Sequence, residues 1–240
     1  MSSTQAYGEE WYWDKRYQQE SGPFDWYQKY PSLSPLLRLY IPKSSQMTTS
    51  SVLVVGCGTS AFSEGMVDDG YEDVVNIDIS SVAIETMRER YSNRPQMKYL
   101  KMDVRNMSAF QSDSFVAVID KGTLDSLLCG HNSRENAAKM LQEVARVLKA
   151  NGVYILITYG APTYRLHLLR EAHSWSIKLH VIGKAFLEAS SEHHTQELTS
   201  PVPLNDDLSL TLVKNPDVHY IYVCIKRDES GGQYFNNIHL

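Results

Sequence analysis

Cysteine is scarce in this sequence, and long apolar runs are absent. Only three of the 240 residues are cysteines, and Cys57, Cys129 and Cys224 lie far apart in the chain. Scattered cysteines in odd number argue against a disulfide framework and are typical of free thiols in a reducing compartment, so we expect a cytoplasmic location. No apolar run reaches the roughly 18 residues that a transmembrane helix needs, and the first residues lack the apolar region of a signal peptide.

Positive charge is also in short supply. The formal net charge is −5, whereas a general nucleic-acid-binding protein normally carries a basic stripe. We therefore expect no direct nucleic acid binding and no membrane partner, and the sequence leaves the oligomeric state open. Histidines and cysteines do not cluster at metal-ligand spacing. The adjacent His193 and His194 lie in a polar segment and are best interpreted as solvated, so we predict no metal site.

A strand followed by a glycine turn and a helix is the most informative motif in the sequence. Residues 52–55 are apolar and mostly β-branched, as in a strand that is covered on both faces. Gly56 and Gly58 allow a sharp turn and the close approach of a ligand to the backbone. Asp78 follows twenty residues after Gly58, at the end of a second apolar strand. A nucleotide-binding sheet places there the acid that binds a ribose diol.

Segments with strand character alternate with segments of helical period along most of the chain. We expect strands at 52–55, 73–77, 97–101, 115–119, 153–158, 176–183 and 218–225. Three helices are expected at 9–20, 61–69 and 162–172. Two more are expected to start at Ser34 and at Ser80 or Ser81, and a sixth is expected to end at Asn151-Gly152. This alternation predicts an α/β, Rossmann-like fold with a seven-stranded, mostly parallel sheet and helices on both faces. An antiparallel strand is expected at the C-terminal end of the sheet.

The chain is expected to have three parts. Residues 1–50 form an N-terminal helical lid segment, residues 51–227 form the cofactor-binding domain, and residues 228–240 form a flexible tail. Within the domain, the polar residues 185–215 are interpreted as an insertion loop, in which alternating leucines at 208–212 could form a short strand.

The glycine turn alone does not identify the nucleotide. Gly56-x-Gly58-x-x-Ala61 also fits the dinucleotide fingerprint of NAD enzymes. Three features favour S-adenosylmethionine. First, only one such turn is present, and the chain has no room for a separate substrate domain. Second, the sheet is expected to end in an antiparallel hairpin. Third, Asp103 follows the third strand, where it can accept a hydrogen bond from an adenine amino group. Asp103 could equally be a turn residue.

Several motifs together resemble one known family. They are Tyr12-Trp13-Asp14-Lys15-Arg16-Tyr17, Asp25-Trp26-Tyr27, the glycine turn, Asp78-Ile79-Ser80-Ser81-Val82, Met102-Asp103-Val104-Arg105, Asp120-Lys121-Gly122-Thr123-Leu124-Asp125 and His219-Tyr220-Ile221-Tyr222. The chain resembles class I methyltransferases that modify lysines of translation elongation factor 1-alpha, over most of residues 10–183 and 217–226. Ser60 stands where many methyltransferases have glycine, Thr59 stands where close relatives have asparagine, and residues 185–215 do not match.

The resemblance implies roles for individual residues. Trp13, Tyr17 and Trp26 would contact S-adenosylmethionine and make the N-terminal segment a lid, although the residues alone favour simple packing of Trp13 and Tyr17. The other residues that would bind the cofactor are Gly56 and Gly58 at the methionine and ribose, Asp78 at the ribose hydroxyls, Ile79 beside the adenine, Asp103 and Val104 at the adenine edge, and Lys121 at the floor of the site.

Methyl transfer from a sulfonium is a direct displacement that mainly needs alignment and a neutral nucleophile. Asp120 and Asp125 flank Lys121 at the carboxyl end of the fourth strand, where ligands bind in open α/β sheets. We predict that these three residues are catalytic, with the two carboxylates attracting a lysine ammonium and passing its proton to water. The alternative is that one carboxylate, Asp125, only caps the following helix. The absence of an Asn-Pro-Pro-Tyr turn disfavours methylation of glutamine, adenine or cytosine amino groups.

Three functions remain open from the sequence. The first is a protein-lysine methyltransferase with a protein substrate such as elongation factor 1-alpha. The second is a small-molecule methyltransferase, and the third is a cofactor-binding scaffold without turnover. An open acidic groove would favour the first, and a closed apolar pocket would favour the second.

Overall fold

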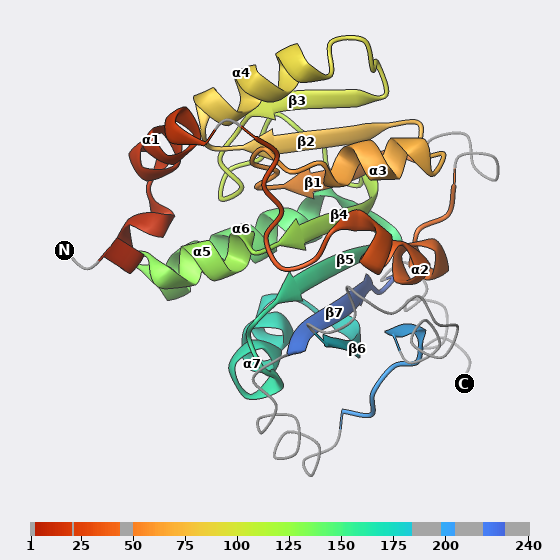
Figure 1. The fold of residues 1–240 in the computed structure, drawn as a ribbon. Helices are drawn as coiled ribbons and strands as arrows, with labels where there is room; N and C mark the ends of the chain where they lie inside the picture. Colours follow the sequence, from red (N-terminus) through yellow and green to blue (C-terminus); the bar gives the residue numbers. More distant parts are fainter. Residues whose placement is uncertain (1–2, 21, 44–49, 184–197, 205–217, 229–240) are drawn as a thin grey trace, which may run out of the picture.

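The computed structural model describes residues 3–20, 22–43, 50–183, 198–204 and 218–228 (Figure 1). The two adjacent histidines and the alternating leucines at 208–212 lie outside the described residues, as do most of the expected insertion loop and tail. The boundaries expected for the three parts of the chain therefore stay predictions.

Seven strands form one sheet with the order β3-β2-β1-β4-β5-β7-β6. Their bounds are β1 Val52–Val55, β2 Val74–Asp78, β3 Met97–Lys101, β4 Phe115–Lys121, β5 Leu148–Thr158, β6 Trp175–Gly183 and β7 Val218–Lys226. β1 to β5 pair in parallel, and β7 runs antiparallel to both β5 and β6. The predicted fold class is confirmed, including the antiparallel C-terminal strand.

Helices cover both faces of this sheet. They are η1 Ser3–Gly8 (a 3₁₀ helix), α1 Glu10–Gln19, α2 Tyr30–Tyr40, α3 Phe62–Asp68, α4 Ser81–Arg90, α5 Thr123–Cys129, α6 Ser133–Val147 and α7 Pro162–Ala172. One hydrophobic core joins α2, α3 and α4 to one face of the sheet, and a second joins α5, α6 and α7 to the other. In β1, Val54 belongs to the first core and Val55 to the second, which explains why this strand is apolar at every position.

Two helix boundaries differ from the expectation. α2 begins at Tyr30 rather than Ser34. The first turn of a helix tolerates Pro31, because an N–H there has no partner within the helix, and the helix continues past Pro35. Pro35 has no N–H to donate to the Pro31 carbonyl, and the Ser34 hydroxyl donates to that carbonyl instead, at 3.2 Å. α6 ends at Val147, before the expected Asn151-Gly152, because β5 already begins at Leu148.

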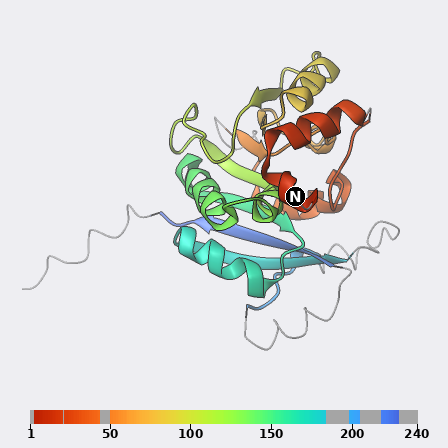
Figure 2. The ribbon, with the colours of Figure 1, turned by 90° about the vertical axis from the view of Figure 1, so that its left-hand side faces the viewer.

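β1 lies at the point where the strand order reverses. The chain passes from β1 outward to β2 and β3, then returns to β4 on the other side of β1. Ligands of open α/β sheets bind outside the carboxyl ends of the strands at such a point. η1 and α1 lie on the side to which the arrowheads of β1 and β4 point, and Figure 2 shows them in front of the carboxyl ends of these strands. Among the helices of the described residues, none has the length and apolar character needed to cross a bilayer.

Candidate active site

The glycine turn after β1 supports two other parts of the site. Gly56 and Gly58 have φ angles of 58° and 50°, a conformation that favours glycine. A Cβ on Gly56 would collide with the Thr123 side chain of α5, and a Cβ on Gly58 would collide with the Tyr17 hydroxyl of α1. Glycine is therefore needed at these positions for the approach of neighbouring protein groups as well as for the turn itself.

Asp78 ends β2 with its carboxylate held by backbone groups. Oδ2 accepts a hydrogen bond from Gly58 N at 2.8 Å, and Oδ1 accepts one from Ser80 N at 2.8 Å. Burial raises the pKa of Asp78 to about 6, although both N–H groups act in the opposite direction. Each oxygen keeps further acceptor capacity, so the carboxylate is suited to bind a pair of hydroxyl groups.

The residues after β3 form the next wall. Asp103 Oδ1 accepts a hydrogen bond from Arg105 N at 2.8 Å, and the Arg105 guanidinium forks onto both carboxylate oxygens. The turn interpretation of Asp103 is therefore confirmed, and the same residue also lines the pocket beside Val104. Ile79, directly after the buried Asp78, lines the pocket as well.

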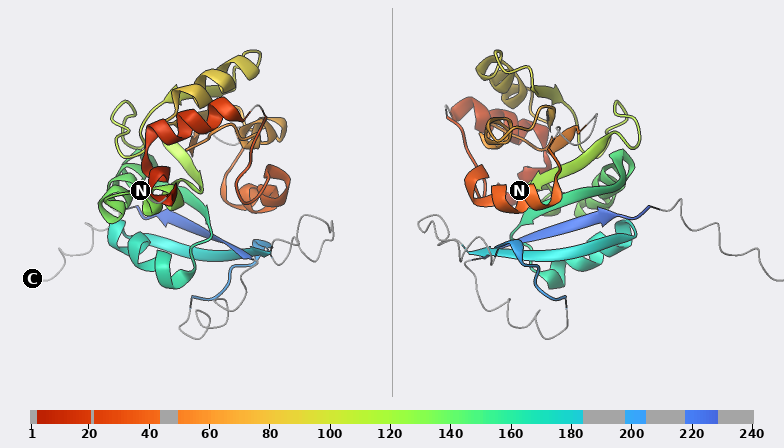
Figure 3. Two further views of the ribbon diagram at one scale, coloured as in Figure 1. Left: turned by 60° about the vertical axis from the view of Figure 1, so that its left-hand side comes forward. Right: turned by 90° about the vertical axis from the view of Figure 1, so that its right-hand side faces the viewer.

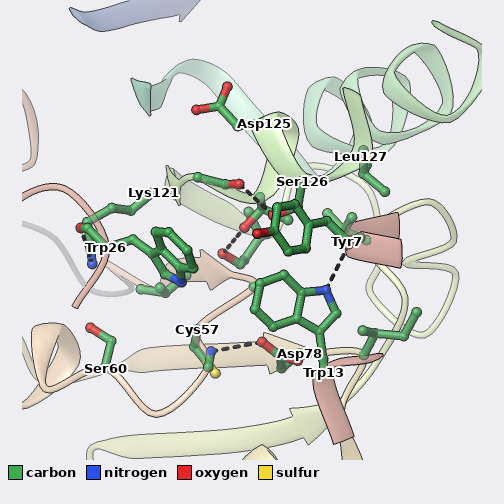
Figure 4. A pocket seen from close by; sticks show the side chains of 18 of the residues that line it. Tyr7, Trp13, Trp26, Cys57, Ser60, Asp78, Lys121, Asp125, Ser126 and Leu127 are labelled. Carbon is green, nitrogen blue, oxygen red and sulfur yellow. Dashed lines mark hydrogen bonds between the residues drawn. The ribbon is translucent and has the colours of Figure 1, made fainter. Parts of the chain in front are cut away.

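Aromatic side chains of the N-terminal segment cover the pocket. Trp13 stacks on Tyr17 with ring centroids 5.8 Å apart, and Trp13 Nε1 donates to the Tyr7 carbonyl at 2.8 Å. The Arg16 guanidinium lies 5.8 Å from the Trp13 ring and 4.9 Å from the Trp26 ring, and so joins α1 to the segment that follows it. Figure 4 shows Tyr7, Trp13 and Leu127 toward one end of the pocket, and Trp26, Lys121 and Ser60 toward the other.

Lys121 is buried in a contact with this same segment. Its Nζ donates to Asp25 Oδ1 and to the Trp26 carbonyl, both at 3.0 Å, and its side chain is only 9% exposed. The Ser60 hydroxyl also donates to Asp25. Burial lowers the pKa of Lys121, and the Asp25 carboxylate opposes that shift. Lys121 thus holds the residues before α2 over the end of β4.

Asp120 lies behind the site and is fully buried. Its carboxylate accepts hydrogen bonds from Thr123 N at 2.7 Å and from Leu124 N, and from the Tyr154 hydroxyl at 2.8 Å. Burial raises the pKa of Asp120 to about 7. The carboxylate that caps α5 is therefore Asp120, so the interpretation of Asp125 as the helix cap is wrong.

Asp125 binds four donors that come from three different parts of the chain. Oδ1 accepts from Thr158 Oγ1 and from Arg165 Nη2, both at 2.6 Å. Oδ2 accepts from the Tyr27 hydroxyl at 2.7 Å and from Tyr159 N at 3.3 Å. Tyr27 has a φ angle of 63°, which is rare for an aromatic residue and marks a strained backbone held by its surroundings.

One pocket brings nearly all of the predicted site residues together. Its lining includes each residue expected to bind the cofactor, namely Trp13, Tyr17, Trp26, Gly56, Gly58, Asp78, Ile79, Asp103, Val104 and Lys121. Asp125 also lines this pocket, whereas Asp120 does not. Within the described ranges, no group of three or more His, Cys, Asp or Glu side chains is placed to hold a metal ion.

Sequence reasoning missed several residues of the pocket. Tyr7 and Gly8 of η1 line it together with Leu127 and Cys129 of α5. Gly8 lies against the backbone of Gly130, which directly follows α5. The sequence signal for these residues was the Tyr7-Gly8 pair, which lies just ahead of the aromatic helix α1. Tyr27 belongs to the Asp25-Trp26-Tyr27 motif, but its contact with Asp125 joins residues 98 positions apart and leaves no local pattern in the sequence.

Comparison with known proteins gives consistent results. Residues 53–156 match the family model of a methyltransferase domain. The chain is 36% identical over 192 residues to EEF1A lysine methyltransferase 4 of Bos taurus, covering 75% of this chain and 73% of that protein. It is 39% identical over 193 residues to the eEF1A lysine and N-terminal methyltransferase of Bos taurus, covering 76% of this chain but only 26% of the relative. The chain thus spans about a quarter of that longer relative.

The fold is also that of a solved methyltransferase. A phosphoethanolamine N-methyltransferase 2 of Haemonchus contortus, solved with S-adenosylhomocysteine, has a TM-score of 0.58 and 14% identity, covering 95% of this chain and 61% of that one. The residues present fit S-adenosylmethionine, because a buried carboxylate with spare acceptor capacity follows β2 and aromatic side chains line the adjoining walls. S-adenosylmethionine is therefore the cofactor of the domain, and the chain belongs to the eEF1A lysine methyltransferase family of class I methyltransferases.

Proposed function

We propose that this chain methylates the side-chain amine of a lysine in a protein, with eEF1A as the first substrate to test. The observation that carries the proposal is the 36% identity to EEF1A lysine methyltransferase 4, which extends over 73% of that relative. Because eEF1A acts in translation, the proposal includes a cytoplasmic location. The free thiols of Cys57, Cys129 and Cys224 are consistent with it.

The pocket has the features that a methyl transfer to an amine requires. Bound S-adenosylmethionine supplies a methyl group on a positively charged sulfur. A neutral amine can attack this methyl carbon directly, with S-adenosylhomocysteine as the leaving group. The protein contributes alignment, and positioning alone can lower a barrier by about 7–11 kcal/mol. Lys121 ends β4 and Asp125 lies in the first turn of α5, so the two residues flank the β4–α5 turn at the pocket. Hydrogen bonds to Asp25 and Trp26 fix Lys121, and hydrogen bonds from Thr158 and Arg165 fix Asp125. In this proposal they position the two reactants.

The carboxylates near the site are already partnered. The Arg105 guanidinium forks onto Asp103, four donors bind Asp125, and Asp120 caps α5 behind the pocket. A lysine with a pKa of roughly 10.4 costs about 4.6 kcal/mol to deprotonate at pH 7, and partial desolvation in the pocket lowers that cost. We therefore propose that the substrate lysine loses its proton to water. Asp125 assists by its position at the pocket rather than as a free base, and Asp120 acts indirectly by capping α5.

Incubation with methyl-labelled S-adenosylmethionine and purified eEF1A tests this function, followed by mass spectrometry of its lysine-containing peptides. We expect label on a lysine with the wild-type chain and, at a cofactor concentration near the wild-type Kd, much less label with Asp78→Ala. A parallel incubation with a cell lysate, separated into proteins and small molecules, tests the wider class of substrate. Label on another protein would replace eEF1A in the proposal, and label only on small molecules would favour a small-molecule methyltransferase. Cofactor binding without any transfer would indicate a scaffold.

A further inference from the structure

Asp14 of α1 binds the N-terminal end of a different helix. Its Oδ1 accepts hydrogen bonds from Ser80 Oγ at 2.6 Å and from Val82 N at 3.3 Å, and its Oδ2 accepts from Ser81 Oγ at 3.4 Å. Both views in Figure 3 show α1 next to α4. The first N–H groups of a helix have no partner within the helix and carry partial positive charge. Asp14 therefore caps α4 from another segment of the chain.

Ser80 connects this cap to the cofactor-binding carboxylate. Its N–H donates to Asp78 Oδ1 at 2.8 Å, its hydroxyl donates to Asp14, and its hydroxyl oxygen accepts from Ala83 N at 3.2 Å. The Asp14 contact therefore fixes the rotamer of Ser80 and the turn between β2 and α4. Asp78 lies at the start of that turn, so its position depends on the same group.

The same contact fixes one wall of the pocket. Asp14 stands next to Trp13 in α1, and both Trp13 and Tyr17 line the pocket. Trp13 in turn donates to the Tyr7 carbonyl of η1. The ion pair that joins α1 to β3, between Glu10 and Lys101, is exposed on both sides, at 44% and 49%. Exposed ion pairs contribute little, so among the polar contacts of α1 in the described part of the chain we take the hydrogen bonds of Asp14 as the stronger anchor.

We propose that Asp14 is a positioning residue for cofactor binding, because its cap on α4 sets both the Asp78 turn and the aromatic wall of α1. This inference rests on the cofactor alone and does not depend on which substrate receives the methyl group. Burial would raise the pKa of Asp14, but the hydrogen bonds from Ser80 and Val82 lower it below its ordinary value. The carboxylate is therefore charged at neutral pH, as a cap on a helix N-terminus requires.

Isothermal titration of S-adenosylhomocysteine into four proteins tests the inference: the wild type, Asp14→Leu, Asp14→Asn and Glu10→Gln. Leucine keeps the branched shape of the side chain but accepts no hydrogen bond, whereas asparagine keeps one oxygen for Ser80 and Val82. We expect Asp14→Leu to raise the Kd about tenfold or more and Asp14→Asn to recover part of that loss. Glu10→Gln, on the same helix, should stay within about twofold of the wild type.

A second pair of variants tests the route through Ser80. Ser80→Ala should weaken binding more in the wild-type background than in the Asp14→Leu background, because both changes remove the contact between Ser80 and Asp14, whereas the loss of the Ala83 hydrogen bond is the same in both. Melting temperatures without ligand are measured for every variant. An Asp14→Leu protein that binds within about twofold of the wild type would overturn the inference. The same follows if Asp14→Asn binds as poorly as Asp14→Leu and the affinities simply follow the melting temperatures.

Discussion

The Tyr27 hydroxyl donates a 2.7 Å hydrogen bond to Asp125 and thereby ties the N-terminal segment to the helix that follows β4. The Tyr27 ring also lies against Gly122, whose φ angle of 91° shapes the turn before that helix. Tyr27 adopts a strained backbone to reach this position. The bond therefore connects the cover of the pocket to the turn at which we place the methyl acceptor.

Tyr27→Phe removes only this hydroxyl. We expect the rate of methyl transfer at saturating cofactor to fall about tenfold, since a hydrogen bond to a charged group is worth about 1.5–3 kcal/mol, while the Kd for S-adenosylhomocysteine stays near that of the wild type. Tyr30→Phe is the matched control, because Tyr30 also donates at 2.7 Å to an aspartate, Asp69, away from the pocket. Equal rates for the two variants would contradict the role given to Tyr27.

Gly58→Ala tests the contact between the glycine turn and α1. The new Cβ would meet the Tyr17 hydroxyl and would also strain a backbone at φ 50°, so cofactor affinity should fall by more than tenfold. Adding Tyr17→Phe should restore part of the affinity. Gly70→Ala serves as control, because Gly70 has a φ angle of 96° and nothing within 4 Å of the new Cβ. Without any rescue by Tyr17→Phe, the collision would not be the cause.

Asp78→Ala should raise the Kd for S-adenosylhomocysteine by more than tenfold with the fold intact, because each bond from a ribose hydroxyl to this carboxylate is worth about 1.5–3 kcal/mol. The pKa of Asp78 is raised to about 6 by burial, and a protonated carboxyl accepts these bonds less well. Wild-type affinity should therefore weaken as pH falls through about 6. Calorimetry between pH 5 and 8 would show a flat profile if Asp78 did not bind the cofactor.

Asp120 should make stability depend on pH. Its folded-state pKa of about 7 lies above its ordinary value of 3.8, so its stabilising contribution is present below the lower value and is lost as pH rises through the higher one. The melting temperature of Asp120→Asn minus that of the wild type should therefore increase by a few degrees from pH 5 to pH 8. Asp69, whose pKa is lowered chiefly by its hydrogen bond from Arg38, supplies the contrast, since Asp69→Asn should destabilise the protein at pH 8.

Hydrogen exchange on residues 9–30 tests whether the aromatic segment acts as a lid. Trp13, Tyr17 and Trp26 line the pocket, so S-adenosylhomocysteine should add protection to this segment beyond that in the free protein. The backbone of β5 provides an internal reference that should change little. Equally slow exchange with and without ligand would show that these residues only pack the domain.

The central part of the fold could be predicted because its signals are local. β1 follows from its apolar run, and the glycine turn follows from Gly56 and Gly58. The start of α4 follows from Ser80, whose hydroxyl oxygen accepts a hydrogen bond from Ala83 N three residues later. The start of α2 could not be found in the same way. Pro31 and Pro35 are both acceptable near a helix start, and the Ser34 side chain that permits the earlier one is visible only in three dimensions.

The separate roles of Asp120 and Asp125 were beyond sequence reasoning. The two carboxylates stand at similar distances from the Lys121 turn, and either could have capped α5. The choice is made by Tyr154, which reaches Asp120 from β5, and by Arg165 and Tyr27, which reach Asp125 from α7 and from the N-terminal segment. Such partners depend on the packing of elements distant in sequence, which no spacing records.

The N-terminal segment is synthesised before the sheet, yet two of its polar contacts reach residues far along the chain. Asp14 reaches Ser80 across 66 positions, and Asp25 reaches Lys121 across 96. The donors Ser80 and Lys121 are not in place until β2–α4 and β4–α5 have formed. The entropy lost in closing each of these long loops must be offset by the contacts made afterwards. During refolding, the recovery of helix and sheet should therefore precede the recovery of cofactor binding, so that a nascent chain carries its sheet before it can hold its methyl donor.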